Sequence, residues 1–175
     1  MNLGLKIIFR LFLLFALSLS VSCGFKMRSE MHQPFNMMYT NLDSNSRFGV
    51  MLMRMLKTRS PNLKFVDNPK DAEIILKTSE LRRERTPISL DALGKVEEYE
   101  LYLELEFSLH DASNNILLPQ SIISSTRIMP YDILQSSASD QESDFLYEDM
   151  EREIASKLFG RITASDISNN FLKKN

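Results

Sequence analysis

The sequence predicts an α+β fold, in which two helices pack on one face of a mostly antiparallel or mixed sheet of about four strands. Two patterns predict this two-layer sandwich. Residues 96–110 alternate between apolar and polar side chains, as a strand with one buried face does. Residues 47–59 and 140–162 repeat apolar side chains every three or four positions, as amphipathic helices do. The 175 residues fit one such domain, since domains usually take about 100–200 residues.

The first 25 residues differ from the rest of the chain. Lys6 and Arg10 are followed by the apolar run LFLLFALSLSV and then by small residues that lead to Cys23. This order is typical of a secretory signal peptide, and we expect residues 1–22 to be removed. The apolar run is shorter than the ~20 residues that span a bilayer, although a membrane-anchor helix is the alternative interpretation.

The segment SVSC, which ends at the single cysteine, resembles the bacterial lipobox. A lipobox cysteine is acylated and becomes the new N-terminus, so Cys23 is predicted to carry S-diacylglycerol and N-palmitoyl groups. Residues 23–35 would then form a lipidated N-terminus and tether. Ser20 departs from the large aliphatic residue that lipoboxes prefer, and the alternative is a secreted protein with a spare thiol. Gly24, in place of Asp, favours the outer membrane.

The predicted domain covers residues 36–165, and its first half contains a strand, a helix and two further strands. Residues 37–42 form the first strand, and the polar cluster 43–46 offers N-cap side chains to the helix at 47–59. Pro61 ends this helix, because the residue before a proline avoids the helical conformation. Residues 63–66 and 73–86 form the next two strands.

The second half is a hairpin followed by a helix. The strand 96–110 is joined through a turn at 111–115 to a return strand at 116–129. After a polar linker at 136–139, the helix 140–162 begins with acidic residues, which favour a helix N-terminus. Residues 166–175 are predicted to be a frayed tail. The core should consist of the two helical stripes and the apolar side chains of the long strand: Tyr99, Leu101, Leu103, Leu105, Phe107 and Leu109.

The opposite face of the long strand carries four glutamates, Glu98, Glu100, Glu104 and Glu106. Same-face residues two apart stand ~7 Å from each other, a spacing that acid–base catalysis can use. However, a row on an open face has one environment, and catalytic carboxylates need different environments to separate their pKa values. The other interpretations are a solvated face, balanced by cations from residues 81–85 or by Arg127, and a surface that contacts a polar partner.

Several functional classes are disfavoured. A net charge of −2 argues against nucleic-acid binding, which requires a basic excess. The five glycines form no phosphate-binding loop, and the motifs GxSxG, HExxH and CxxC do not occur. Only His32 and His110 could join a metal site, because Cys23 is assigned to lipidation. We therefore expect no metal, no cofactor and no enzymatic activity.

Several segments together resemble the LptE family, the lipopolysaccharide-assembly lipoproteins of Gram-negative outer membranes. They are CGF after the signal peptide, the strand LDALGKVEEYELYLELEFSLHDA, the return strand ILLPQSI and the helix SDQESDFLYEDMEREIASKLFGRI. The resemblance implies a sheet with two helices and no enzymatic activity. It also implies a lipid-anchored protein on the periplasmic side of the outer membrane. There it would plug the LptD β-barrel, assist its assembly and take part in inserting lipopolysaccharide into the outer leaflet.

The resemblance also implies that basic side chains near one end of the sheet contact the anionic lipopolysaccharide. Lys95 occupies one position where family members carry a basic residue, whereas the second such position is Ser139. Arg82, Arg83 and Arg85 are candidates to compensate for that serine. The alternative is that all four cations serve solubility.

For the whole protein, the alternative function is that of a stand-alone periplasm-facing lipoprotein that binds a lipid or glycan in an apolar pocket.

Overall fold

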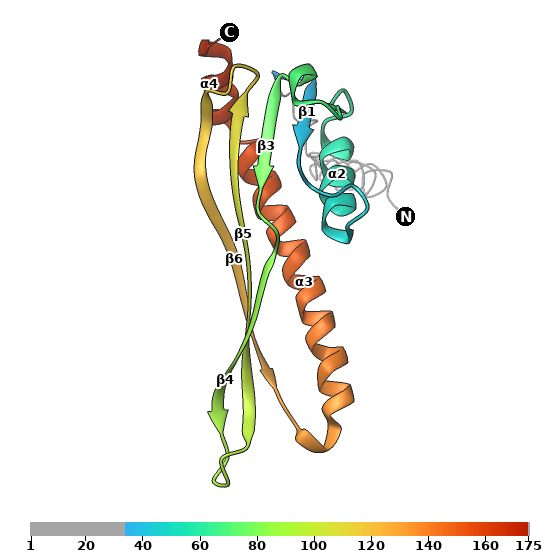
Figure 1. Cartoon of the computed structure of the whole chain (residues 1–175), viewed down its shortest axis with the longest axis vertical. Coiled ribbons are helices and arrows are strands. Elements are labelled where there is room, and N and C mark those ends of the chain that lie inside the picture. The colour runs from blue at the N-terminus through green and yellow to red at the C-terminus, as the bar shows by residue number, and fades with distance from the viewer. Residues whose placement is uncertain (1–33, 175) are drawn as a thin grey trace, which may run out of the picture. The chain divides into compact units, whose positions relative to one another are not determined.

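The computed structural model of the chain describes residues 34–174 (Figure 1). The predicted signal peptide, the lipidation site Cys23 and nearly all of the tether lie outside these residues. None of the described helices is both long and apolar enough to cross a bilayer.

The described residues form a six-stranded mixed sheet. The strands are β1 (Met37–Thr40), β2 (Lys64–Phe65), β3 (Ile74–Thr78), β4 (Arg82–Leu90), β5 (Val96–Asp111) and β6 (Ile116–Pro130). β1 lies between β2 and β3; β3 and β4 pair in turn with one edge of β5, and β6 pairs with its other edge. β1 is parallel to β2 and β3, whereas all pairs that involve β5 are antiparallel.

The sheet has more strands than the four or so predicted, because the short strand β2 also pairs in the sheet and because residues 73–86 form two strands. Both strands pair with β5, one after the other. β3 pairs with residues 107–111 and β4 with residues 96–104. Between them, Ser79 donates its N–H to the carbonyl of Glu106, and its Oγ accepts the N–H of Glu106. The chain thus continues from β3 into β4 along the same edge of β5, and the β4–β5 hairpin, with β6 alongside, extends beyond β1, β2 and β3 (Figure 1).

The helix predicted at 47–59 is confirmed as α2 (Arg47–Arg59). Ser46 caps it, because its Oγ accepts the N–H of Gly49 at 3.0 Å. The second predicted helix is α3 (Ser136–Ile162), which starts four residues earlier than predicted since the polar segment 136–139 is helical. Short 3₁₀ turns, η2 (Pro69–Asp71) and η3 (Ile133–Gln135), connect strands and helices.

The prediction of a frayed tail was wrong, because Ser165–Lys174 form a further helix, α4. Ile167 is 1% exposed and Phe171 is 8% exposed, and both belong to the core. The Phe171 ring meets Phe35 edge-on, with 5.8 Å between the ring centroids. Phe35 is itself buried, so the folded domain begins one residue before the predicted boundary at 36.

The predicted core is confirmed along β5. The five residues from Leu101 to Leu109 with odd numbers are at most 2% exposed, whereas Tyr99 is half-buried. α3 runs along β5 and β6 on this face and supplies the facing side chains (Figure 1). α2 packs against α3. The α3 side chains that face β5 and β6 include Met150, Ile154, Leu158 and Ile162.

Candidate functional site

Lys95 lies in the tight turn between β4 and β5. The carboxylate of Asp91 accepts the N–H groups of Leu93 and Lys95, both at 2.8 Å, and this fixes the loop. Gly94 takes a positive φ of 78°, a conformation that glycine adopts without strain. The side chain of Lys95 is exposed, and no carboxylate of the described residues lies within ion-pair distance of it. Lys95 is therefore available to an anionic partner.

Exposed apolar side chains surround this end of the hairpin. The turn and the connection between β6 and α3 come together because Tyr131 donates its N–H to the carbonyl of Glu97 at 2.7 Å. We call residues 88–96, which include the end of β4 and the turn, and residues 131–135, which include η3, the distal end. Five of its apolar side chains are between 47% and 90% exposed: Ile88, Leu90, Leu93, Ile133 and Leu134. A cation among exposed apolar groups is suited to an amphipathic anion.

The three arginines do not join Lys95 in one cluster. Alternate residues of a strand point to opposite faces, so Arg82 lies on the glutamate face, whereas Arg83 and Arg85 face α3. All three are engaged within the fold. Arg82 forms ion pairs with Glu84 and Glu104, the latter at 3.2 Å. The structure therefore does not bring together the set of four cations that the sequence suggested.

Arg83 and Arg85 bind acidic residues of α3 and stack on tyrosines. The guanidinium of Arg85 lies 4.0 Å from the ring centroid of Tyr99 and pairs with Asp140 at 3.2 Å. Arg83 lies over the ring of Tyr147, whose hydroxyl donates to the backbone carbonyl of Glu84 at 2.6 Å. Burial raises the pKa of the Tyr147 phenol. These contacts attach the β4 edge to α3.

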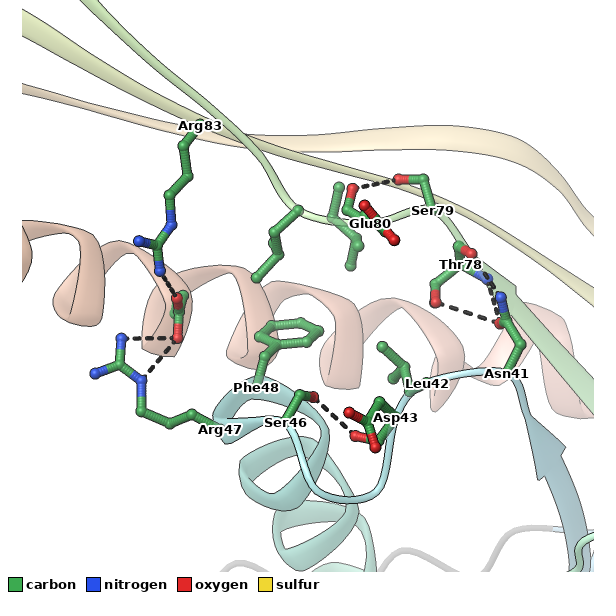
Figure 2. A pocket seen from close by; sticks show the side chains of 13 residues that line it. Asn41, Leu42, Asp43, Ser46, Arg47, Phe48, Thr78, Ser79, Glu80 and Arg83 are labelled. Carbon is green, nitrogen blue, oxygen red and sulfur yellow. Dashed lines mark hydrogen bonds and ion pairs between the residues drawn. The ribbon is translucent and has the colours of Figure 1, made fainter.

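A buried carboxylate, Glu151, connects three elements. Its side chain is 4% exposed and accepts hydrogen bonds from Arg47 of α2, at 3.0 and 3.1 Å, and from Arg83 of β4, at 2.6 Å. Figure 2 shows both arginines pointing to this carboxylate from opposite sides. Arg47 also pairs with Glu148, at the surface of α3. Sequence reasoning missed this site, although position 151 falls inside the apolar stripe of the helix.

The same residues border a cleft of about 580 Å³. Its wall is formed by the β1–α2 connection, the β3–β4 connection and α3 (Figure 2). Leu42, Phe48, Leu81 and Leu105 supply apolar surface, and the other residues that line the cleft are polar or charged. Asn41 closes one end, because its side-chain amide exchanges two hydrogen bonds of 2.8 Å with the backbone of Thr78. The cleft is thus mixed in character, with apolar side chains beside paired charged groups such as Glu151 and Arg83.

The glutamate face is not a row of free carboxylates. Glu104 is 8% exposed, accepts the hydroxyl hydrogen of Tyr102 and pairs with Arg82. Glu106 accepts a hydrogen bond from the side-chain amide of Gln120. Glu98 and Glu100 are half-buried on the same face. Two of its four glutamates are therefore bonded within the sheet, and Ile122 and Ile128, which are opposite Glu106 and Glu100, add exposed apolar side chains to the same face.

A second charged network fastens β6 to α3. The carboxylate of Glu153 accepts hydrogen bonds from Lys157, Ser125 and Arg127, at 2.6, 2.7 and 2.8 Å respectively. These hydrogen bonds lower the pKa of Glu153 to about 2. Arg127 also pairs with Asp149 at 3.0 Å. The sequence had suggested Arg127 as a balance for the glutamate face, but its side chain lies on the helix side.

Comparison with known proteins places this architecture among envelope lipoproteins. Residues 35–162 match the family described as LptE, Lipopolysaccharide-assembly. The structure is similar to the solution structure of an uncharacterized lipoprotein B from Nitrosomonas europaea, with 30% identity and a TM-score of 0.67. That match covers 81% of this chain and 91% of the other. No curated protein matches the chain.

Two further structures share the fold at lower identity. The rare lipoprotein B from Shewanella oneidensis is 22% identical, with a TM-score of 0.64 over 75% of this chain and 97% of the other. A minor lipoprotein from Acinetobacter baumannii is 18% identical, with a TM-score of 0.60 over 77% and 95%. The family match spans the whole sheet, α2 and α3. We conclude that the chain belongs to the LptE family and has a role in lipopolysaccharide assembly.

Proposed function

We propose that this chain is an outer-membrane lipoprotein, anchored through Cys23 on the periplasmic side, that plugs the LptD barrel. In this role it assists assembly of the barrel and takes part in inserting lipopolysaccharide into the outer leaflet. The family match over residues 35–162 carries the proposal. The bonded polar groups around Glu104, which are Tyr102 and Arg82, support it, because a barrel interior is polar and favours hydrophilic groups on a plug.

The proposed contact for lipopolysaccharide is the distal end. Lys95 would meet a phosphate or carboxylate of the glycolipid, and the five exposed apolar side chains would meet its acyl region. Ser139 is 6% exposed, so the second family position offers neither a cation nor room for a long side chain. We assign Arg82, Arg83 and Arg85 to the fold, because each has acidic partners.

The proposed role is not enzymatic. Two of the four glutamates that could have served as acid and base, Glu104 and Glu106, are bonded within the sheet. The alternative, a stand-alone lipoprotein that binds a lipid or glycan, requires an apolar cavity between the sheet and the helices. The cleft beside Glu151 combines apolar side chains with paired charged groups, so it is not a purely apolar cavity of this kind.

Affinity purification of the acylated chain from detergent-solubilised envelopes tests the plug. We expect a large outer-membrane barrel protein to remain bound in a fixed ratio, and a free, monomeric lipoprotein would refute the proposal. Binding of purified lipopolysaccharide to the chain tests the distal end separately. Lys95→Ala should weaken binding about tenfold, the effect of losing one charge-assisted contact. The matched control is Lys70→Ala, at an exposed lysine in η2, which should leave binding unchanged.

A further inference from the structure

The two segments of the distal end lie beyond the hydrophobic core. None of the residues 88–96 is buried, and Ile133 and Leu134 are 54% and 90% exposed. The core ends before them, at Leu101 of β5 and Met129 of β6, which are both fully buried. The position of one segment relative to the other therefore depends on specific contacts near the end of the core.

Arg85 lies where the two segments meet. It is opposite Leu101 in the β4–β5 pair and faces α3. Its guanidinium lies 4.0 Å from the ring centroid of Tyr99 and 5.3 Å from that of Tyr131. The two rings meet edge-on, with 5.1 Å between their centroids and an interplanar angle of 81°. We call Arg85, Tyr99 and Tyr131 the clamp.

Arg85 contacts the β6–α3 connection on both sides of η3. Before η3 it lies over Tyr131, and after η3 it pairs with Asp140 of α3 at 3.2 Å. The hydrogen bonds that Asp132 accepts within η3 shape this turn but do not attach it to the β4–β5 hairpin. The backbone bond from Tyr131 to Glu97 does attach it, and the clamp adds side-chain contacts at the same place.

The chemistry of arginine suits this position. The quadrupole of an aromatic ring attracts a cation that lies over its face. A planar guanidinium can stack on a ring while its N–H groups bind a carboxylate, which the ammonium of lysine cannot do in the same way. The side chain of Arg85 is 29% exposed, so most of this contact is shielded from water. Without Arg85, the two segments lose the cation that both of them contact.

We propose that Arg85 is a positioning residue for lipopolysaccharide binding, because the clamp holds residues 131–135 beside the turn that carries Lys95. This inference rests on the proposed function, in which the distal end contacts the glycolipid. Lys95 belongs to one segment, whereas the exposed side chains of Ile133 and Leu134 belong to the other. A ligand that touches both segments binds only those molecules in which they lie together. Its apparent Kd rises as that population falls.

Binding of purified lipopolysaccharide to the acylated chain tests the inference. Arg85→Ala should weaken binding about tenfold, the effect expected if about one molecule in ten keeps the two segments together. The matched control is Arg83→Ala, which removes the same charge two residues away on the same face of β4, where Arg83 lies over Tyr147. This control should lose stability but bind normally while it is folded. Unchanged binding by folded Arg85→Ala, or an equal loss in Arg83→Ala, would overturn the inference. If Arg85→Ala does not fold, Tyr131→Ala replaces it.

A double-mutant cycle separates positioning from direct contact. Ile133→Ala and Leu134→Ala together remove the apolar side chains that the clamp is proposed to position. In that background, Arg85→Ala should weaken binding by less than about twofold, because the two effects act through the same segment. A loss of about tenfold in both backgrounds would show that Arg85 acts independently of this segment, which contradicts the inference.

The distance between the two segments can be measured directly. Spin labels are attached to Leu93→Cys and Leu134→Cys, at positions that are 80% and 90% exposed. Cys23, the single native cysteine, is acylated in the proposed function and leaves only the two introduced thiols to react. The distribution of label-to-label distances should be narrow in the parent and in Arg83→Ala, but broad in Arg85→Ala. A contribution of Arg85 to stability alone would lower the thermal melt and leave this distribution narrow, and that result would refute the positioning role.

The two proposals fail differently. If Lys95→Ala weakens lipopolysaccharide binding but Arg85→Ala does not, the positioning role is wrong and the proposed contact at the distal end stands. If Lys95→Ala leaves binding unchanged, the proposed contact is wrong, and the inference fails with it.

Discussion

Replacing the buried Glu151 by alanine should destabilise the domain substantially. The substitution removes the acceptor for three hydrogen bonds, which come from Arg47 and Arg83. Removing one partner of a fully buried ion pair costs about 3–5 kcal/mol. Here the two arginine side chains are 50% and 46% exposed, so water can reach them after the substitution. We therefore expect a loss of about 2–3 kcal/mol, below the range for a fully buried pair.

Urea unfolding followed by far-UV circular dichroism measures this free energy, and calorimetry should show a fall in Tm of roughly 4–12 °C. Glu148→Ala is the matched control, because Glu148 pairs with the same Arg47 but its side chain is 44% exposed. Its expected cost is about 0.5 kcal/mol. Equal losses of unfolding free energy for the two substitutions would show that burial of the carboxylate does not determine its contribution to stability. In a double-mutant cycle, Glu151→Ala should be coupled to Arg83→Ala.

Three further predictions concern the core, the pH dependence and the last helix. Leu103→Ala, at a fully buried position, should cost about 2–5 kcal/mol, whereas Ile128→Ala should cost under about 0.5 kcal/mol in the isolated domain; equal urea midpoints would contradict this. The pKa of Glu153 is lowered from 4.5 to about 2, so its contribution is present above pH ~4.5 and lost as the pH falls through ~2. In Glu153→Gln, the part of the acid-induced loss of stability that comes from Glu153 should be absent. This part amounts to about 1–2 kcal/mol after allowance for solvent screening. Phe171→Ala should cost about 2–4 kcal/mol and Leu172→Ala almost nothing, and a tail that did not pack would show no difference in thermal melts.

The elements with strong local signals were predicted from the sequence. α2 has an N-cap at Ser46 and a proline directly after its C-cap, and its bounds match the prediction. β5 and β6 follow from alternation along a long hairpin. α3 was predicted to start too late, because its first turns are polar and because the buried faces there use Ser139 and Ser143 instead of apolar residues.

The errors come from contacts that no local pattern contains. Residues 73–86 alternate without a visible break, so the separation of β3 from β4 depends on the pairing of both with β5. α4 has only a few apolar residues in a polar segment, and its stability depends on Phe35, far away in the sequence. At the site, Lys95 is exposed as expected, whereas the acidic partners of Arg83 and Arg85 lie on a helix more than fifty residues later.

The edge-on pair of Phe35 and Phe171 closes the hydrophobic core between the first and the last segments of the folded domain. During synthesis, an emerging chain holds Phe35 long before Phe171 exists. The nascent polypeptide can form the β5–β6 hairpin early, but it cannot complete its core until nearly all of the domain has left the ribosome. Completion of the core therefore waits until the last helix has been synthesised.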